Sequence, residues 1–286
     1  YPNLSSINLS IISFSCAIIF FAVFDSNHFI ILKITQKQGK LKTFMHSTLP
    51  QNNNIKINPI KAFKDNYIWL IEEDRNAIIV DPGDASPVLK ELKKRNMNLV
   101  SILITHKHYD HIGGVEELIN NHPNVQIYGP ENIDFKFKYK IVKEGDVVEI
   151  NRTSVKFYVL ETPGHTLDHV VFVDKYRLFS GDTLFACGCG KLFEGSHEDM
   201  FKSLSKISSL TPNTKVYCAH EYTKQNIKFA LTIDADNHQL RERYKRLKNI
   251  EITIPSLLKE ELETNPFLRA KTSEEFKLIR KRKDEF

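Results

Sequence analysis

LVSILITHKHYDH (residues 99–111) joins a short apolar run to three imidazoles and one carboxylate. The branched run 99–104 is typical of a buried strand, and the polar residues after it are expected on the loop at its end. A tetrahedral zinc site takes three or four protein ligands, so four donors in one loop, pointing in different directions, suit two metal ions. Ordinary hydrogen-bonded histidines are the alternative, but desolvating so many polar groups without a metal is costly.

Length and charge indicate a globular protein with a full hydrophobic core. The 286 residues predict one large domain and a smaller one. Residues 1–56 carry five lysines and one aspartate, a net charge of +4, whereas the other 230 residues carry 35 basic and 34 acidic groups, a net +1. A near-neutral body does not indicate a phosphate-binding surface, so we expect no nucleic-acid partner.

The four cysteines show neither a CxxC pair nor the spacing of a disulfide framework, which favours a reducing or redox-neutral compartment. They are Cys16, Cys187, Cys189 and Cys218. Cys187-Gly-Cys189 could ligate a metal, but the flanking glycines favour a tight loop.

Residues 1–56 are typical of a targeting leader. The predominantly apolar run 11–24 is fourteen residues long, too short for a spanning helix, which needs about 20, so we expect no stable membrane insertion of the mature protein. Their length fits a signal-peptide core, and the basic, acid-poor stretch that follows resembles the two-part leader of apicoplast proteins. A mitochondrial presequence is one alternative. The other is a cytoplasmic protein whose translation starts at Met45.

Strand and helix patterns alternate from residue 57 onward, which predicts an α/β layered domain. Strands are expected at 67–71 and 77–80, joined as a hairpin, followed by a helix over 86–96 with Ser86 as its N-cap. A second helix is expected at 115–121. Further strands are predicted at 126–128, 147–150, 155–160, 170–173, 177–180 and 215–218.

Potential metal ligands follow four of these strands. His165 lies in a Pro-Gly turn, Asp182 follows a glycine and His220 follows the strand 215–218, in addition to the histidine loop. Strand ends at one edge of a sheet are where α/β proteins place their sites.

Helical spacing dominates the C-terminal region, and no strand is expected after Tyr222. The helices are predicted at 224–231, 237–248, 256–263 and 272–283. Thr272 and Glu275 have the spacing of a capping box. A small helical domain is the simplest interpretation.

These motifs together resemble the metallo-β-lactamase superfamily over residues 57–224. GDTLFACGCGK (181–191), HEYT (220–223) and NPFLR (265–269) resemble one family within it, the hydroxyacylglutathione hydrolases or glyoxalases II. The resemblance implies a four-layer αβ/βα sandwich followed by a small all-α domain. It divides the chain into a leader (1–56), a metallo-β-lactamase-like domain (57–224) and a helical substrate-binding domain (225–286).

The resemblance also implies a centre of two divalent cations. It assigns His106, His108 and His165 to one ion, Asp110, His111 and His220 to the other, and Asp182 to both. Zinc is favoured, and iron or manganese would also suit these ligands. Asp81 is expected either to orient a ligand histidine from behind or simply to form a turn.

The implied reaction is hydrolysis of S-D-lactoylglutathione to D-lactate and glutathione, the second step of methylglyoxal detoxification. A hydroxide between the metals would attack the thioester carbonyl, with Asp110 and Asp182 as the carboxylates of the catalytic centre. The residues that the family uses toward glutathione correspond to Lys191, Phe193, Tyr222, Arg280 and Lys283. Phe193 departs from the family, which usually has a tyrosine there, so one substrate hydrogen bond is expected to be lost.

Three other functions fit part of this sequence pattern. A mononuclear iron persulfide dioxygenase shares most of the histidine motif but generally lacks the helical tail, and a nuclease fits poorly with a near-neutral body. A metal-binding homologue without activity is the third, although all seven ligands are intact. The sequence makes no prediction of the oligomeric state.

Overall fold

The computed structural model describes residues 19–25, 28–34 and 55–286, and the chain divides into two units, 1–51 and 52–286. In the first unit β1 (Ile19–Asp25) and β2 (His28–Ile34) form an antiparallel ladder. Most of the expected leader, including the start of its apolar core and Met45, lies outside the described residues, so the targeting interpretation stays a prediction. None of the described helices is long and apolar enough to cross a membrane.

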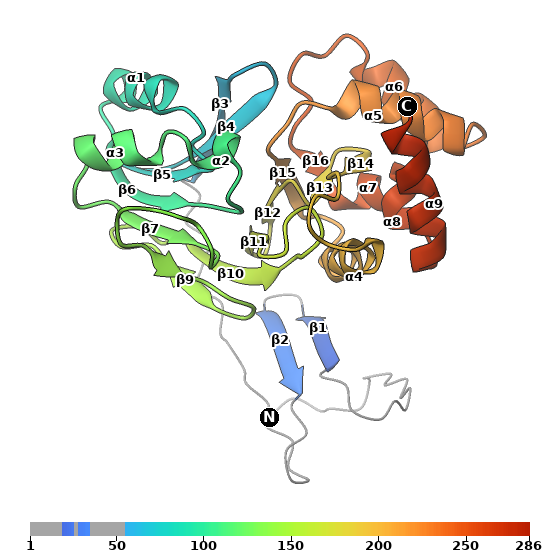
Figure 1. Cartoon of the computed structure of the whole chain (residues 1–286), viewed down its shortest axis with the longest axis horizontal. Helices are drawn as coiled ribbons and strands as arrows, with labels where there is room; N and C mark the ends of the chain where they lie inside the picture. The colour runs from blue at the N-terminus through green and yellow to red at the C-terminus, as the bar shows by residue number, and fades with distance from the viewer. Residues whose placement is uncertain (1–18, 26–27, 35–54) are drawn as a thin grey trace. The chain divides into compact units, whose positions relative to one another are not determined.

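A six-stranded mixed sheet carries the histidine stretch. Its strands are β3 (Lys56–Ala62), β4 (Asn66–Glu73), β5 (Asn76–Val80), β6 (Asn98–Leu103), β7 (Gln126–Gly129) and β8 (Lys140–Ile141), in that order. The first three are antiparallel, and β5 to β8 are parallel. The helices α1 (Ala85–Arg95) and α3 (Val115–Asn121) cover its outer face (Figure 1), where Val88 and Leu118 pack on Ile68 and Ile102.

The second six-stranded sheet carries the other predicted ligands. In spatial order its strands are β16 (Ser256–Leu257), β15 (Lys215–Cys218), β12 (Arg177–Gly181), β11 (Val170–Val173), β10 (Lys156–Glu161) and β9 (Val147–Glu149). Only β12 and β15 pair in parallel. A small hairpin, β13 (Leu184–Phe185) and β14 (Gly188–Cys189), and α4 (His197–Ser208) lie between these two strands in sequence.

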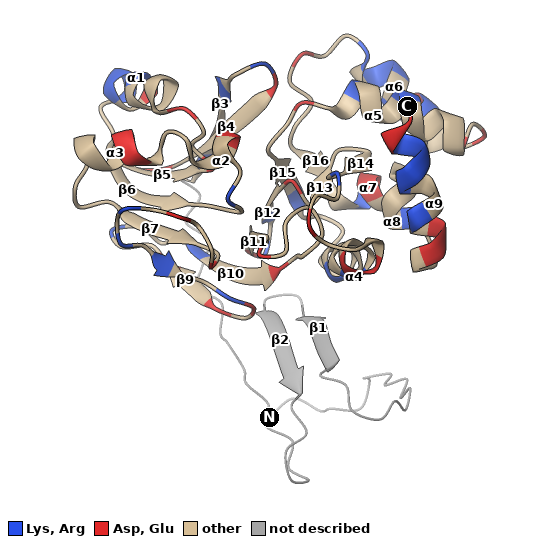
Figure 2. Cartoon of the chain, in the orientation of Figure 1, with Lys and Arg blue, Asp and Glu red and all other residues tan. Residues whose placement is uncertain are grey.

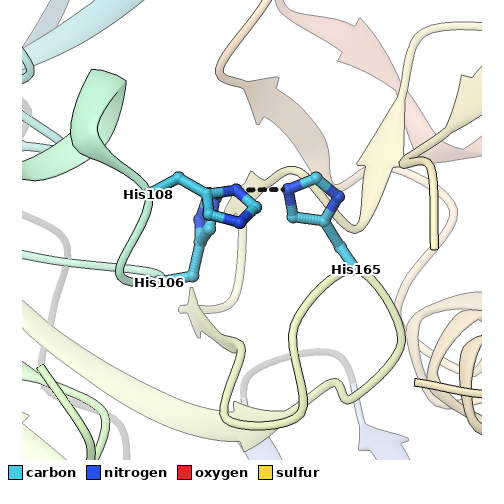
Figure 3. A group of neighbouring side chains, drawn as sticks. All are labelled: His106, His108 and His165. Carbon is cyan, nitrogen blue, oxygen red and sulfur yellow. Dashed lines mark hydrogen bonds between the residues drawn. The ribbon is translucent and has the colours of Figure 1, made fainter. Parts of the chain in front are cut away.

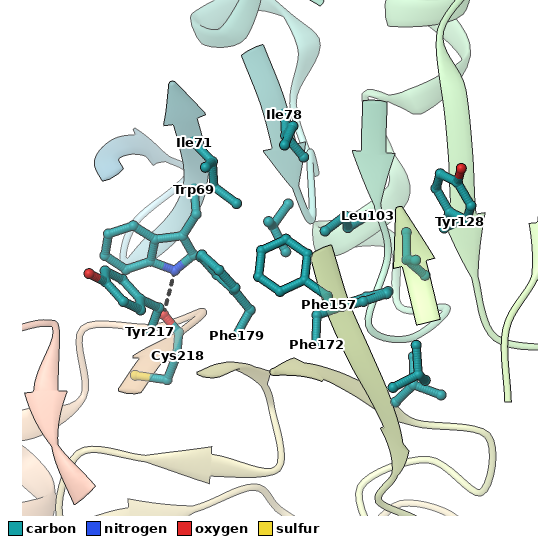
Figure 4. Close-up of a cluster of buried hydrophobic side chains, with 14 of the residues drawn as sticks. Trp69, Ile71, Ile78, Leu103, Tyr128, Phe157, Phe172, Phe179, Tyr217 and Cys218 are labelled. Carbon is teal, nitrogen blue, oxygen red and sulfur yellow. Dashed lines mark hydrogen bonds between the residues drawn. The ribbon is translucent and has the colours of Figure 1, made fainter. Parts of the chain in front are cut away.

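Aromatic side chains from both sheets fill the space between them (Figure 4). Trp69 packs edge-on against Tyr217, with ring centroids 5.0 Å apart, and its indole N–H donates to the Cys218 carbonyl. Phe157 and Phe172, from the second sheet, are fully buried in the same cluster. Because strands such as β4 are buried on both faces, they show near-continuous apolar runs. The predicted four-layer αβ/βα sandwich is confirmed.

The C-terminal region is helical, as predicted. It contains α5 (Thr223–Ile233), α6 (His238–Leu247), α7 (Leu258–Thr264), α8 (Pro266–Arg269) and α9 (Ser273–Asp284). Phe229, Phe267 and Phe276 pack with α4 against the outer face of the second sheet. The expectation that no strand follows Tyr222 is wrong, because β16 pairs with β15 and covers an otherwise open sheet edge.

Several local predictions also needed correction. Asp84, not Ser86, caps α1, because its extended backbone lets the carboxylate accept the Ser86 N–H. The stretch expected to be a loop contains a one-turn helix, α2 (Tyr109–Ile112). At α9, Thr272 accepts the Glu275 N–H, but the Glu275 carboxylate accepts the Lys271 N–H, so only half of the capping box forms. The division at residues 56 and 224 stays a prediction.

Candidate metal centre

The seven predicted metal ligands meet at one end of the two sheets. His106 and His108 follow β6, and Asp110 and His111 lie in α2. The others, His165, Asp182 and His220, follow β10, β12 and β15. They form three overlapping groups in which the potential ligand atoms lie within 4.8 Å of one another: His106, His108 and His165; His106, His111 and Asp182; and Asp110, His111 and His220.

The first group consists of three ring nitrogens that converge on one point (Figure 3). His108 Nδ1 lies 3.1 Å from His106 Nε2 and 2.9 Å from His165 Nε2. A neutral imidazole has one N–H donor and one nitrogen with a lone pair. If all three rings turn their lone pairs inward, none of these short contacts is a hydrogen bond, because each joins two acceptors. Three lone pairs facing one point are what a cation requires.

The third group, Asp110, His111 and His220, combines two imidazoles with a carboxylate. Asp110 Oδ2 lies 3.5 Å from His111 Nε2 and 3.4 Å from His220 Nε2. Asn66, a residue that the sequence did not single out, donates to the same Asp110 oxygen at 2.9 Å. This group is therefore held on its outer side by a side chain at the start of β4.

Asp182, a member of the second group, lies between the first and the third and turns one oxygen toward each. Its Oδ1 lies 3.5 Å from His111 Nε2 and 3.4 Å from His220 Nε2, whereas its Oδ2 lies 3.4 Å from His165 Nε2. The carboxylate is buried, and it is the one acid placed so that its two oxygens could serve two cations.

Four of the histidines have an oxygen atom behind Nδ1. For His106, His165 and His220 the contact is a hydrogen bond, and for His111 it is an ion-pair contact without hydrogen-bond geometry. These contacts are Thr105 Oγ1 to His106 (3.0 Å), Asp81 Oδ2 to His111 (3.1 Å), the Lys191 carbonyl to His165 (2.7 Å) and Asp65 Oδ1 to His220 (2.9 Å). An acceptor at Nδ1 fixes the tautomer and leaves the Nε2 lone pair for a metal.

Two of these outer partners bear on the sequence interpretation. Asp81 also accepts the N–H and the hydroxyl of Thr105, at 2.7 and 2.8 Å, which supports its orienting role over that of a simple turn former. Asp65 could not be identified from the sequence, because it lies 155 positions from His220 and its neighbours form only an ordinary polar turn before a strand. Its carbonyl accepts the Glu221 N–H, which ties the two loops together.

Electrostatics differ strongly between the histidines. Burial, reinforced by the neighbouring imidazoles, holds the pKa of His106 well below its ordinary value. For His220 burial acts in the same direction, but the Asp182 and Asp110 carboxylates and the bond to Asp65 outweigh it and raise the pKa to about 9. Burial would raise the pKa of Asp182, yet the His111 and His220 imidazoles lower it below its ordinary value.

Two inward-facing atoms, His111 Nε2 and Asp182 Oδ1, are buried without a hydrogen-bond partner. Buried polar atoms without a partner are costly, and a cation between them would satisfy both. Imidazole and carboxylate donors suit divalent transition metals. The residues present thus fit a divalent metal site.

His169 is a further buried histidine that the sequence did not single out. Its Nε2 accepts the Asp182 N–H at 3.1 Å, and its Nδ1 lies 3.1 Å from the hydroxyls of Thr162 and Thr183. It therefore supports the Asp182 backbone. Its position four residues after His165 in the same turn was the available signal.

Three of the expected substrate residues border the centre. Phe193 is 62% exposed, and its ring lies 5.4 Å from His108 and 5.2 Å from His165. The Lys191 ammonium lies 5.8 Å from the Phe193 ring, and the Tyr222 ring stacks on His220 at 4.8 Å. Phe193 and Lys191 therefore border the first group of histidines, and Tyr222 borders His220 of the third group.

The two residues of α9 are placed differently. Arg280 is only 4% exposed; its guanidinium donates to the Cys189 carbonyl at 3.1 Å and pairs with Asp284 at 2.9 Å. The Lys283 ammonium lies 5.0 Å from the ring centroids of Phe229 and Phe286. The helix is basic toward its C-terminus (Figure 2), but Arg280 is engaged inside the protein rather than displayed on that surface.

The Cys187-Gly-Cys189 segment forms the tight turn that its glycines favoured. Cys187 lies in the turn that joins β13 to β14, whereas Gly188 and Cys189 form β14 itself, and neither cysteine belongs to the ligand groups. Burial raises the pKa of the Cys189 thiol to about 11, and the Cys187 thiol contacts the Thr264 carbonyl.

Comparisons with known proteins agree with this geometry. The metallo-β-lactamase superfamily profile matches residues 63–220, and the profile of the hydroxyacylglutathione hydrolase C-terminus matches residues 221–286. Proteins named hydroxyacylglutathione hydrolase from Aliivibrio salmonicida (strain LFI1238) and Pseudoalteromonas translucida (strain TAC 125) are 49% and 45% identical, over 74% and 76% of this chain and 86% of each relative.

Solved structures share the fold at lower identity. ETHE1 from Myxococcus xanthus superposes with a TM-score of 0.61 at 24% identity, covering 79% of this chain and 89% of that one. TTHA1623 in a di-iron-bound form gives 0.55 at 23% identity, covering 73% and 99%. Because both profiles and relatives at nearly half identity span the chain from the first sheet to α9, it belongs to the hydroxyacylglutathione hydrolase family of the metallo-β-lactamase superfamily.

Proposed function

We propose that this protein hydrolyses S-D-lactoylglutathione and related 2-hydroxyacylglutathiones to the hydroxy acid and glutathione, the second step of methylglyoxal detoxification. The observation that carries the proposal is the C-terminal profile over residues 221–286, which is specific to hydroxyacylglutathione hydrolases and adjoins a complete set of seven ligands. The names of the relatives at 45–49% identity support the same reaction.

The centre is proposed to hold two divalent cations. His106, His108 and His165 would bind the first, and Asp110, His111 and His220 the second, with Asp182 shared between them. Zinc is the favoured metal, with iron or manganese as alternatives. When bound, such ions supply a hydroxide at neutral pH and polarise the thioester carbonyl.

The protein's own residues contribute orientation and binding. Asp65, Asp81, Thr105 and the Lys191 carbonyl hold the imidazoles in place from behind. The leaving thiolate needs little help from an acid, because thiol pKa values lie near 8.5. The exposed Lys191, beside Phe193, is suited to a carboxylate of glutathione. Lys283 adds a positive charge on α9, whereas the buried Arg280 acts from inside through its bond to the Cys189 carbonyl.

The test is thioester hydrolysis by purified, metal-loaded protein and by its Asp182→Ala variant. Loss of the shared carboxylate is expected to lower kcat by about 100-fold or more. Asp199→Asn, which changes a carboxylate in the capping box of α4, should retain full activity. Full turnover in Asp182→Ala would refute the shared-carboxylate centre.

Two other functions predict different products. Oxygen uptake with glutathione persulfide would indicate a persulfide dioxygenase, which the match to the hydrolase C-terminus disfavours. Metal binding with neither reaction would indicate a non-catalytic homologue.

The leader is a separate proposal, supported by the apolar run 11–24 and the acid-poor stretch after it. Residues 1–56 fused to a fluorescent protein are expected to reach a plastid, or alternatively a mitochondrion. A diffuse cytosolic signal would contradict both targets.

A further inference from the structure

The β13–β14 hairpin occupies the short stretch between two parts of the metal centre. Asp182 precedes Leu184, its first residue, and Lys191 follows Cys189, its last. The Lys191 carbonyl is the group that holds His165 from behind. Any shift of the hairpin therefore acts on the shared carboxylate at one end and on a histidine ligand at the other.

Contacts between the hairpin ends leave little room for such a shift. The Gly190 N–H donates to the Thr183 carbonyl at 3.2 Å. A Cβ at Gly190 would lie 1.9 Å from the Asp182 carbonyl oxygen and 3.2 Å from His165 Nδ1. The hairpin is thus packed directly against the backbone that carries the ligands.

The hairpin backbone is held by side chains from the C-terminal helices. Asn265 Nδ2 donates to the carbonyls of Phe185 and Gly188 at 3.2 and 3.0 Å. The other contacts are Asn226 Nδ2 to the Ala186 carbonyl (3.1 Å), Arg280 to the Cys189 carbonyl (3.1 Å) and the Cys187 N–H to Glu261 Oε2 (2.7 Å). Each residue from Phe185 to Cys189 has a main-chain group bonded in this way.

Glu261 is the charged member of this set and is fully buried. Its Oε2 accepts the Cys187 N–H, and its Oε1 pairs with Arg243, whose side chain is also buried. Arg243 contacts Glu260 and the Thr264 hydroxyl as well, at 3.3 and 2.7 Å. Burying an ion pair is costly unless its remaining donors and acceptors are satisfied, and the Cys187 N–H and the Asn265 amide both donate to the free oxygen of Glu261.

The backbone conformation of Cys187 explains why the turn needs a hydrogen bond from outside the hairpin. Its φ of 57° lies in the left-handed region, which is unfavourable for a residue other than glycine. The hydrogen bond to Glu261 holds this conformation at the tip of the turn. The C-terminal helices thereby determine the shape of the loop that supplies Asp182.

We propose that Glu261, paired with Arg243, is a positioning residue for the metal centre. It acts through the hairpin on Asp182 and on the carbonyl that orients His165, so the helical region controls metal affinity in addition to its expected contacts with substrate. This inference rests on the metal centre of the proposed function, and its readout is metal binding rather than hydrolysis.

The adjacent residue offers a matched control. Glu260 and Glu261 both pair with Arg243, but of the two only Glu261 bonds to the hairpin. Arg243 and the Cys187 N–H bond to different oxygens of Glu261. Glu261→Gln turns one of these oxygens into an NH2 group, so one of the two donors faces another donor. Glu260→Gln makes the same chemical change without touching the hairpin.

The experiment is zinc titration of the full chain against a chromophoric chelator, without substrate, with urea unfolding of each metal-free variant measured alongside. Glu261→Gln is expected to weaken binding of at least one zinc ion by about 10- to 100-fold, the range seen when groups that orient metal ligands are lost. Glu260→Gln should stay within about twofold of the unsubstituted protein, since its change leaves the groups behind the ligands in place.

If Glu261→Gln does not fold, a second variant tests the role of the hairpin. Asn226→Ala removes only the bond to the Ala186 carbonyl and is expected to weaken zinc binding by several-fold without a change of charge. Unchanged zinc affinity in the folded variants, or an equal loss in Glu260→Gln, would overturn the proposal. Normal zinc binding by the unsubstituted protein without thioester hydrolysis would instead contradict the proposed function alone.

Discussion

The orientation of each imidazole ring is the residue-scale feature on which the metal centre depends. His106, His165 and His220 each have Nδ1 hydrogen-bonded to an outer group, and His111 Nδ1 faces the Asp81 carboxylate, so that Nε2 turns inward in all four. His108 is the exception, since its Nδ1 is the atom that faces the other rings. A carboxylate behind a ring raises its basicity, whereas a carbonyl or a hydroxyl mainly fixes its tautomer.

Phe193 provides a residue-scale prediction. Phe193→Tyr is expected to lower KM for S-D-lactoylglutathione by about 2- to 10-fold, because a restored hydroxyl adds one hydrogen bond worth about 0.5–1.5 kcal/mol. The ring is exposed beside His108 and His165, so the hydroxyl has room. Steady-state kinetics of both proteins measure the effect, and an unchanged KM would remove Phe193 from the substrate site.

His220 predicts a pH dependence of the metal-free protein. Its folded pKa of about 9 lies above the ordinary value of 6.5, so the protonated ring stabilises the fold fully below pH 6.5. This contribution is lost as the pH rises through 9. The stability difference between the unsubstituted protein and His220→Gln is therefore expected to shrink by about 1–3 kcal/mol between pH 6 and pH 9.

Urea unfolding in the presence of a chelator measures this difference. A difference that stays constant across the range would show that the carboxylates around His220 do not hold its proton. With metal bound the dependence should disappear, because the coordinating ring is neutral.

At the scale of the element, strand ends supply the ligands and helix caps hold the surrounding structure. The loops after β6, β10, β12 and β15 end within reach of one another because their strands reach the same end of the packed sheets.

Helix α4, which the sequence interpretation missed, begins with a complete capping box of Ser196 and Asp199. That signal was present, but the residues before it were interpreted only as a family motif.

Thr272→Ala tests a cap at this scale. The Thr272 hydroxyl accepts the Glu275 N–H at the start of α9, so its loss is expected to lower the free energy of unfolding by about 1 kcal/mol. Lys271→Ala, one residue earlier, removes an exposed side chain and should change stability by less than about 0.5 kcal/mol. Equal effects in urea unfolding would show that the cap contributes nothing.

At the scale of the whole molecule, the metal centre joins the two sheets. His106, His108, Asp110 and His111 follow strand β6 of the first sheet, and the remaining ligands follow strands of the second. Metal binding therefore links two halves of the sandwich that otherwise meet through their apolar core. Any ligand that binds only the folded state stabilises it by mass action.

Metal removal tests this linkage. Chelation is expected to abolish turnover and to lower Tm by roughly 10 °C, since metal at 1,000 times its Kd contributes about 4 kcal/mol to a domain of this size. Adding zinc back should restore both. A Tm that is unaffected by chelation, measured by differential scanning calorimetry with the metal content checked, would contradict the linkage.

Several strongly patterned elements could be predicted from the sequence, although the twelve-residue α4 and the seven-residue β3 were missed. The strands β4, β5, β6 and β11 and the helix α3 lie where the apolar runs placed them, because their burial imposes that pattern. The strands β8, β13, β14 and β16 have two residues each and were missed. Such strands exist only through pairing with distant partners, which leaves no local pattern.

The sequence by itself determined the donor set, the fold family and the helical tail, because metal chemistry and burial restrict which residues can follow a strand. The tertiary structure decided which donors face one another, that Asp182 lies between two groups, and which residues hold the rings from behind. Asp65 and Glu261 illustrate the reason: each acts on a group more than 70 positions away, so its role depends on how the chain packs and not on its neighbours in sequence.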